Sequence, residues 1–553
     1  MAGALLGCAD PPEASLFKSG ALQPIRDGEL VRVEGTDFLL GERPFRFVGA
    51  NVAAMHGAKM RDAMPRLVRS AARDRIRVLR VWALGEAPES DEEWRGRYSF
   101  RLGPDGWVED SFVHLDRLLA AAREHSLRVI IVLANRWGDY GGLSQYARWM
   151  GMEPHRRNLL HAELAQVLSD PRSRALYRAH AERIVSRVNT VTGVAYRDDP
   201  TIMAWELINE LNVGTCAAAE AVRDWVAHMS DFVRGLDPNH LIAAGHIGYH
   251  STLSRDSWRD VHALPNIDYA DYHVYPQNVV GVRRPDQLGA FIADHSHLAR
   301  NVLRKPVVVG EIGFPRGDAV FADRALWFDG FLRLADRSGT AGVLAWIYRP
   351  WDELRDDHGI WPWGPLEQET RSVRAVLKGW STEWGGAPAE VVEPAILGAA
   401  PDDVLQPLDP RSFAVFTEGE WSEAGSGRRT VRIDPWALAE GCAPRSGPAW
   451  ARWVIETPRA GAPSAFRVTR LGPERAADSV DMRVEVDGVV VGHYRGSDGF
   501  VAEEDALADA FVDGPIHFVR LSTTDPASAA LLRRYTAGPV AGDDALELQL
   551  TWR

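Results

Sequence analysis

The sequence predicts an α/β protein, in which a (β/α)8 TIM barrel is followed by a smaller all-β, sandwich-like domain. Three observations lead to this prediction. Over the first two-thirds of the 553 residues, short apolar runs alternate eight times with segments of helical periodicity. Beyond residue 410 the pattern changes to short alternating runs, which are typical of antiparallel strands. A stretch rich in Gly, Ala and Pro separates the two patterns.

The barrel strands are expected where β-branched and apolar residues cluster. Before and into the barrel, Val31–Leu40 and Phe45–Asn51 predict an opening hairpin. The predicted parallel strands are, in order, Arg46–Val52, Val78–Leu84, Arg128–Asn135, Ile202–Ile208, Leu241–Gly245, Ala270–Tyr275, Pro306–Ile312 and Gly342–Tyr348. Helices are expected between them, for example over Ser111–His125 and Ala175–Val188, and residues 137–192 predict long active-site loops with one helix. The functional site is expected at the carboxyl ends of the strands.

The domain boundaries follow from these patterns. We expect a lead at 1–24, the barrel at 25–380, a linker at 381–410 and a β-sandwich domain at 411–553. The strands expected in the sandwich are Arg428–Ile433, Ala451–Glu456, Asp481–Val491, Ile516–Ser522 and Leu546–Trp552. The Trp residues of this domain would form either a carbohydrate-binding platform or, more commonly for such residues, its core.

The composition is that of an average soluble globular protein, with 46% hydrophobic and 25% charged residues. The net charge of −13, from 63 basic and 76 acidic residues, disfavours nucleic acid as a partner. The 20 Trp residues suit an amphipathic ligand such as a sugar, although most are expected in the core. No stretch of the sequence approaches the ~20 apolar residues of a membrane span.

Three Cys residues, at positions 8, 216 and 442, are too few for a disulfide framework or a Cys-based metal site. Cys8 follows Leu5-Leu6-Gly7, which resembles the lipobox of bacterial lipoproteins, in which the Cys is lipidated. The segment before Cys8 is shorter than a secretory signal and has no basic residue. We expect a truncated lipoprotein signal, with a lipid anchor at Cys8 and an extracellular or cell-envelope location; the alternative is a chance match.

Two carboxylates stand at the ends of predicted strands. Asn209 and Glu210 end the fourth strand and Glu311 ends the seventh, so both acids are expected over one mouth of the barrel. Paired carboxyl groups suit glycoside hydrolysis, in which a retaining enzyme holds them ~5–5.5 Å apart. One carboxyl then protonates the leaving sugar while the other attacks the anomeric carbon. The sequence therefore predicts Glu210 and Glu311 as catalytic residues, and the alternative is a structural ion-pair network.

Neighbouring strand ends carry residue types that this chemistry uses. Arg80 would keep the nucleophile ionised, while His273 and Tyr275 would orient the carboxylates and shift their pKa values. Asn209 would donate to the 2-hydroxyl of the sugar, and Trp346 would form a platform beneath it. The predicted substrate-binding residues are Arg80, Trp82, Asn135, Trp137, Asn209, His273, Tyr275 and Trp346.

Other polar and aromatic residues have plainer interpretations. Glu206 is expected to make a structural ion pair. His56 and His358 are expected to be solvated or structural loop residues, the alternative being that they line the sugar groove. Three consecutive side chains cannot all face one ion, so 356–358 predicts a loop turn and not a metal site. Exposed aromatic residues above the barrel mouth are expected to contact ligand; these are Trp137, Trp351, Trp361 and Trp363.

At these residues the chain resembles glycoside hydrolase family 5. The motifs that carry the resemblance are Arg80-Val81-Trp82, Trp205–Glu210, His273–Pro276 and Gly310–Gly313, in that order. The chain is similar in particular to the endo-β-1,4-mannanases of the family, on Phe47–Asn51, Asn135–Gly142 with Gln145-Tyr146, and Asn189–Pro200. The resemblance covers about residues 25–380. It implies a (β/α)8 fold, a retaining mechanism with Glu210 as acid/base and Glu311 as nucleophile, and no metal or organic cofactor.

The expected function is therefore that of a retaining endo-β-1,4-mannanase acting on mannan or glucomannan. The expected partner is this polysaccharide, with no nucleic acid, and the enzyme is expected to be a monomer. Two departures bear on the substrate: Leu211-Asn212 follows the acid/base where family mannanases usually have Pro-Arg, and residues 245–249 are less typical. The alternatives are a β-glucanase or exo-β-mannosidase of the same family, or a non-catalytic carbohydrate-binding lipoprotein. The intact pair of Glu210 and Glu311 argues against the last of these.

Overall fold

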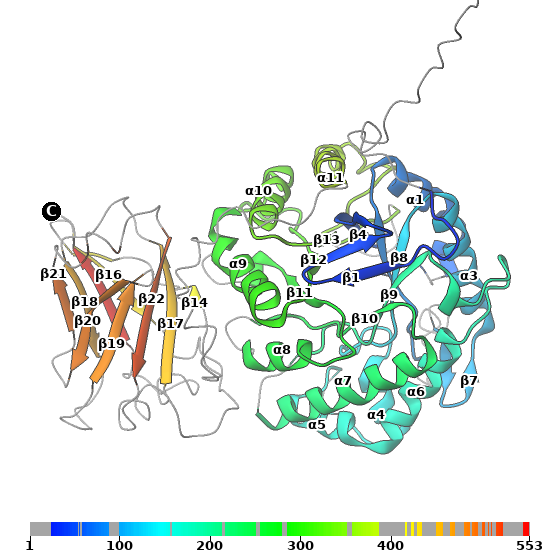
Figure 1. Cartoon of the computed structure of the whole chain (residues 1–553), viewed down its shortest axis with the longest axis horizontal. Coiled ribbons are helices and arrows are strands. Elements are labelled where there is room, and N and C mark those ends of the chain that lie inside the picture. The colour runs from blue at the N-terminus through cyan, green and yellow to red at the C-terminus, as the bar shows by residue number, and fades with distance from the viewer. Residues whose placement is uncertain are drawn as a thin grey trace, which may run out of the picture.

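The computed structural model describes residues 24–53, 55, 58–87, 99–154, 157–212, 216–249, 255–278, 285–350 and 357–385, and then the strands that follow residue 414 together with Leu507 and Ala510. Parallel strands surrounded by helices form the main body of the chain (Figure 1). The strands of this barrel are β4 (Phe47–Asn51), β5 (Val78–Trp82), β8 (Arg128–Val132), β9 (Ile202–Glu206), β10 (Leu241–Ala243), β11 (Ala270–Val274), β12 (Val307–Ile312) and β13 (Gly342–Ala345). All eight lie inside the predicted ranges, so the (β/α)8 prediction is confirmed.

The barrel strands are buried at every position, because one face of each strand lines the interior and the other is covered by helices. The strand order is β10-β9-β8-β5-β4-β13-β12-β11. Between β10 and β11 the barrel is closed by the backbone bonds from Asp268 N to Ile242 O (2.9 Å) and from His273 N to Ile247 O (3.0 Å). The carboxylate of Asp271 also accepts a hydrogen bond from His246 N at 3.0 Å across this seam.

Helices surround the strands (Figure 1). They are α1 (Ala58–Arg73), α3 (Glu109–Glu124), α4 (Gly142–Trp149), α5 (His161–Ser169), α6 (Pro171–Val185), α7 (Cys216–Leu236), α8 (Arg255–His262), α9 (Gly289–His297), α10 (Arg324–Arg337) and α11 (Arg371–Trp384). The two helices named from the sequence correspond to α3 and α6. The described part of residues 137–192 holds three helices and not the one expected, and the expected boundary at residue 380 falls inside α11. None of the described helices has the length and apolar character that crossing a membrane requires.

A small antiparallel sheet covers the amino-terminal end of the barrel. It consists of β1 (Val31–Glu34), β2 (Asp37–Leu40) and β3 (Arg43–Pro44). The expected hairpin, with its turn at Gly41–Pro44, is found in part: β2 pairs with β3, and Phe45 N donates to Phe38 O at 2.8 Å. Val31–Leu40 is not one strand, because the chain already turns at Gly35, whose φ of +59° favours glycine. The ring of Phe38 on β2 packs edge-on against Tyr269 at 5.4 Å, inside an apolar cluster that fills this end.

A short pair of strands, β6 (Arg101–Gly103) and β7 (Gly106–Trp107), lies between β5 and α3. The C-terminal part of the chain forms two five-stranded sheets, which agrees with the predicted all-β, sandwich-like domain. One contains β14 (Val415–Phe416), β17 (Ala449–Glu456), β22 (Ile516–Thr523), β19 (Asp481–Val486) and β20 (Val489–Arg495). The other contains β15 (Ser422–Ala424), β16 (Arg428–Ile433), β23 (Leu546–Thr551), β18 (Ala465–Arg470) and β21 (Phe500–Glu503). The single strand expected over 481–491 is an antiparallel pair, β19 and β20.

Candidate active site

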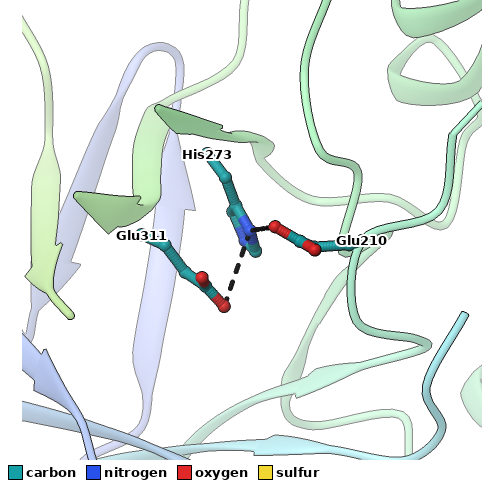
Figure 2. A group of neighbouring side chains, drawn as sticks. All are labelled: Glu210, His273 and Glu311. Atoms are coloured by element: carbon teal, nitrogen blue, oxygen red, sulfur yellow. Dashed lines mark hydrogen bonds and ion pairs between the residues drawn. The ribbon is translucent and has the colours of Figure 1, made fainter. Parts of the chain in front are cut away.

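The two carboxylates singled out from the sequence meet at the carboxyl-terminal mouth of the barrel. Glu210 follows β9 and Glu311 lies near the end of β12. A carboxylate oxygen of each and a ring nitrogen of His273 all lie within 4.8 Å of one another. Figure 2 shows the imidazole of His273 between the two acids, with one dashed line to each. This separation is close to the ~5–5.5 Å at which a retaining glycosidase holds its carboxyl groups.

Local backbone irregularities aim both acids into the mouth. Glu210 has a φ of +57°, a left-handed conformation that is uncommon for a residue with a side chain and is found at functional sites. On β12, Val309 and Ile312 belong to the same core cluster although they are three residues apart. Strict alternation would turn Glu311 to the same side as Val309, away from the barrel interior. The pairing register of β12 with β13 shifts between Val309 and Ile312. Such a bulge re-aims a side chain, and here it turns Glu311 toward His273.

Arg80, on β5, lies beneath the two acids and is fully buried. Its guanidinium has five N–H groups, and each has an acceptor. The acceptors are Glu206 Oε2 (2.8 Å) for Nε, Glu206 Oε1 (2.5 Å) and Asn209 Oδ1 (2.7 Å) for Nη2, and Asn51 Oδ1 (2.8 Å) and Glu311 Oε1 (2.8 Å) for Nη1. The ion pair expected of Glu206 is confirmed. Arg80 has no donor left for a ligand, so it acts on the site through Glu311 and Asn209.

Three further side chains bond directly to the acids. His273 Nδ1 lies 2.9 Å from Glu210 Oε1 and 3.5 Å from Glu311 Oε1. The indole N–H of Trp137 donates to Glu210 Oε2, and the hydroxyl of Tyr275 donates to Glu311 Oε2. Each carboxylate therefore has its own set of donors. The orienting role expected of His273 and Tyr275 matches these contacts.

The environment moves the pKa values of the two acids in opposite directions. Burial raises the pKa of Glu311, and the charge of Glu210 adds to this, against the opposing effects of His273 and Arg80. Burial also raises the pKa of Glu210, but the hydrogen bond and charge of His273 and the bond from Trp137 outweigh it, so the net shift is downward. Burial lowers the pKa of His273, yet the two acids outweigh burial and raise it. The raised pKa of His273 favours its protonated form in the site without substrate.

Aromatic rings form one wall of the mouth. The rings of Trp82 and Trp346 lie 6.0 Å apart, and Tyr140 packs edge-on against Trp82 at 5.7 Å. Trp82 is 7% exposed and belongs to an apolar cluster with Ile347, so it supports Trp346 more than it offers a surface of its own. Trp346 is partly exposed, as a sugar platform requires.

Two amide side chains connect the strand ends. Asn209 Nδ2 donates to Asn135 Oδ1 at 3.1 Å, and Asn135 Nδ2 donates to the carbonyl of Asp139 at 3.0 Å. Asn51 was not among the predicted site residues, yet it accepts from Arg80 and donates to Gly310 O at 2.9 Å. The signal was present, because Asn51 is a polar residue at the end of a buried apolar strand.

The loop residues singled out from the sequence have different outcomes. His358, expected to be solvated or structural, packs edge-on against Tyr275 at 5.5 Å, with its Nε2 2.9 Å from the amide of Gln277. Trp361 is only 4% exposed, so its predicted ligand contact is wrong and it is a core residue. Trp363 stacks under the guanidinium of Arg66 at 4.4 Å. His56, Trp351 and Asp356 lie outside the described residues.

Two carboxylates and an imidazole are also donors that a metal ion can use. The carboxylates of Glu210 and Glu311 already accept bonds from Trp137, Tyr275 and Arg80. An ion between them would meet the positive guanidinium of Arg80, which bonds to Glu311 at 2.8 Å. This donor set suits two carboxyl groups held in different charge states better than it suits a cation.

Comparisons with known proteins agree on one family. A family model described as GH family 5 beta-mannosidase-like matches residues 28–328. Mannan endo-1,4-beta-mannosidase 8 of Oryza sativa subsp. japonica is 32% identical over 318 residues, which cover 53% of this chain and 82% of that protein. Mannan endo-1,4-beta-mannosidase 1 of Solanum lycopersicum is 31% identical over 348 residues, which cover 57% of this chain and 82% of that protein.

Among solved structures, the hyperthermostable endo-1,4-beta-D-mannanase from Thermotoga petrophila RKU-1 is similar over 60% of this chain and 99% of its own length. The two share 28% sequence identity, with a TM-score of 0.52. The residues matched by the family model include β4 to β12 and therefore both acids.

Proposed function

The chain belongs to the glycoside hydrolase family 5 β-mannosidase-like family, and from this premise we propose that it is a retaining endo-β-1,4-mannanase that cuts internal bonds of mannan or glucomannan. The observation that carries the proposal is the pair of carboxylates, Glu210 and Glu311, whose oxygens approach within 4.8 Å at the barrel mouth. The names of the relatives support mannan as the polysaccharide.

The proposed reaction has two steps, with Glu311 as nucleophile and Glu210 as acid/base. In the first, a Glu311 oxygen bonds to the anomeric carbon while the glycosidic C–O bond breaks, and Glu210 gives its proton to the leaving oxygen. In the second, Glu210 takes a proton from water, whose oxygen bonds to the anomeric carbon and releases Glu311. Two inversions give net retention.

The surrounding residues support these roles. Arg80 and Tyr275 donate to the two oxygens of Glu311, which opposes the rise in its pKa caused by burial and fixes its direction of attack. Asn209 gives one amide hydrogen to Asn135, so its second amide hydrogen is available for the 2-hydroxyl of the sugar. Trp346 supplies the apolar surface beneath the sugar ring.

The proton for the first step is proposed to come from His273. Its Nδ1 lies 2.9 Å from Glu210 Oε1, and the neighbouring acids raise its pKa even though burial opposes this. Transfer along this bond converts Glu210 into the acid form. Activity then requires that Glu311 is ionised while the Glu210–His273 pair still holds its proton, and these groups titrate as a coupled set.

We also propose an extracellular or cell-envelope location with a lipid anchor at Cys8, which lies outside the described residues. The support is the lipobox-like sequence and the polymeric nature of mannan. The protein should then partition into the membrane fraction of its cells, whereas a Cys8→Ser variant should not. Recovery of both forms in the same soluble fraction would contradict the anchor.

The function is tested by product analysis of the purified protein incubated separately with mannan, glucomannan and β-glucan, with Glu311→Ala as the control. We expect oligosaccharides of mixed length from mannan and glucomannan, absent with Glu311→Ala. Release of mannose alone would indicate an exo-acting mannosidase, and products from β-glucan alone would indicate a glucanase. A lack of product from all three, with retained binding, would indicate a carbohydrate-binding protein.

A further inference from the structure

Arg136 is a buried cation directly behind the acid/base side of the site. It follows β8, is 3% exposed, and its backbone N–H donates to the carbonyl of Asn209 at 3.0 Å, next to Glu210. The mechanism above does not use it. Burial of a guanidinium is costly unless its charge and donors are compensated, so its place needs an explanation.

The side chain of Arg136 makes two observed contacts. Its Nη2 donates to the carbonyl of Leu159 at 2.8 Å, and its guanidinium carbon lies 4.7 Å from the ring centroid of Trp137. The second contact is a cation–π interaction, which fixes the ring plane of the indole. The N–H of that indole donates to Glu210 Oε2. Arg136 therefore acts on Glu210 through one intervening side chain, that of Trp137.

The remaining donors of Arg136 are not used by the described part of the chain. Its Nε and Nη1 are buried and have no hydrogen-bond partner there. Burial lowers the pKa of Arg136 to about 10, and the charge of Glu210 is the interaction that opposes this. At neutral pH the guanidinium is thus still positive, and the negative charge that compensates it is Glu210.

We propose that Arg136 is a positioning residue for Glu210: it holds the indole of Trp137 against the carboxylate and adds a positive charge that favours the ionised form. This inference rests on the proposed function only for its kinetic readout. The other charged groups that act on this site are Arg80 from β5, His273 from β11 and Glu311 from β12. Arg136 is the cation that approaches from the β8 side.

A simpler role is that Arg136 only ties residues 157–160 to the loop after β8, through Leu159. Arg128 is a matched control for that role, because it begins β8 at the opposite end of the barrel. It too is 3% exposed, and its guanidinium donates to the carbonyls of Glu29 (2.9 Å) and Pro200. It has no contact with the acids.

The first test is the pH dependence of kcat/KM for mannan in wild type, Arg136→Gln, Arg136→Lys and Arg128→Gln. Loss of the positive charge lets Glu210 hold its proton to higher pH, so the alkaline limb of Arg136→Gln should move to higher pH. Its kcat/KM at the optimum should fall about three- to tenfold, as the indole bond loses alignment. Arg136→Lys should keep the alkaline limb of wild type but show a similar fall in kcat/KM. Arg128→Gln should keep both the alkaline limb and the kcat/KM of wild type.

A second measurement needs no substrate. Ionised Glu210 has a lowered pKa, so it stabilises the fold above the ordinary value of 4.5, and this contribution is lost as pH falls through the folded pKa. The difference in melting temperature between wild type and Glu210→Gln should follow that loss. In the Arg136→Gln background the contribution should be smaller, and its loss should be complete at a higher pH.

These readouts separate the two proposals. If wild type cleaves no mannan, the proposed function fails, while the melting experiment still tests Arg136. If Arg136→Gln has the alkaline limb of wild type, and the same pH dependence of the melting-temperature difference, Arg136 only holds residues 157–160 in place and the inference is overturned. An equal limb shift in Arg128→Gln would also overturn it, because the effect would then not depend on proximity to Glu210.

Discussion

The two ends of the barrel interior are built from the same strands but from opposite residue types. At the amino-terminal end, Phe38 and Phe47 pack with Val78 and Val308 in an apolar cluster. Two residues farther along β5 from Val78, on the same interior face, stands the buried guanidinium of Arg80. One end therefore stabilises the fold by burial of apolar surface, and the other holds charges that are stable only because they compensate each other.

This difference has a consequence for mutation. Truncation of an apolar side chain leaves a cavity, with a local cost that depends on the volume lost. Removal of one member of a buried charge network leaves the others uncompensated, and it changes pKa values at the site as well as stability. The two ends should therefore respond to substitution in different ways.

The largest effect is expected from the acids themselves. Glu311→Ala and Glu210→Ala should each lower kcat on mannan by more than about 10³-fold, because each removes a group that bonds to the reacting atoms. The circular dichroism spectrum should remain that of the wild type. Substantial turnover by Glu311→Ala would mean that the charged end of the barrel serves stability, like the apolar end.

Arg80→Met should damage stability and activity together. It leaves Glu206 and Glu311 buried without their cation, and we expect a loss of about 3–5 kcal/mol in the free energy of unfolding. Arg80→Lys keeps a charge but cannot bond to five acceptors at once, so it should rescue only part of the stability. Denaturant unfolding measures both variants. A wild-type midpoint for Arg80→Met would show that the network carries no net stabilisation.

Phe47→Ala tests the apolar end alone. The Phe47 ring is fully buried and stacks on Phe45 at 5.7 Å, so its loss should cost about 3–5 kcal/mol in the free energy of unfolding. Because no catalytic group lies there, kcat/KM per folded molecule should stay within about twofold of wild type. A change in the pH profile of this variant would break the separation between the two ends.

The smallest effect is expected at the rim of the charged end, at Glu86. Its carboxylate is buried, accepts from Gly142 N at 2.9 Å, and has a pKa that burial raises from 4.5 to about 7. Folding then binds a proton that the unfolded chain lacks between pH 4.5 and 7, so stability falls as pH rises through that range. Glu86→Gln lacks this loss, so its free energy of unfolding should increase relative to that of wild type as pH rises, by about 3 kcal/mol at most. A gain that does not depend on pH would exclude titration as its cause.

Much of this architecture could be predicted because it follows from local pattern. The eight apolar runs predicted the barrel strands, and the acids at two strand ends predicted that the site lies at the carboxyl-terminal mouth of the barrel. The hairpin before the barrel could not be placed from periodicity, because one glycine, Gly35, decides where the chain turns. The interior direction of Glu311 also depends on a register shift in β12 that simple alternation does not reveal.

The partners of the acids were harder to predict than the acids. Trp137 was expected as a ligand contact in a loop, yet its N–H bonds to Glu210. That bond depends on residues 135–142 and 157–160 meeting in space, through contacts such as Gly138 N to Asn158 Oδ1 at 2.8 Å. Sequence spacing carries little information about such meetings between loops.

The central claim is that Glu210 and Glu311 act as a retaining pair, and the anomeric configuration of the first product tests it most directly. Proton NMR during hydrolysis of a mannooligosaccharide records which anomer of the new reducing end is formed before mutarotation. The account predicts that the β-anomer appears first and the α-anomer only later. Initial formation of the α-anomer would mean inversion, and would contradict the double displacement by two closely spaced carboxylates.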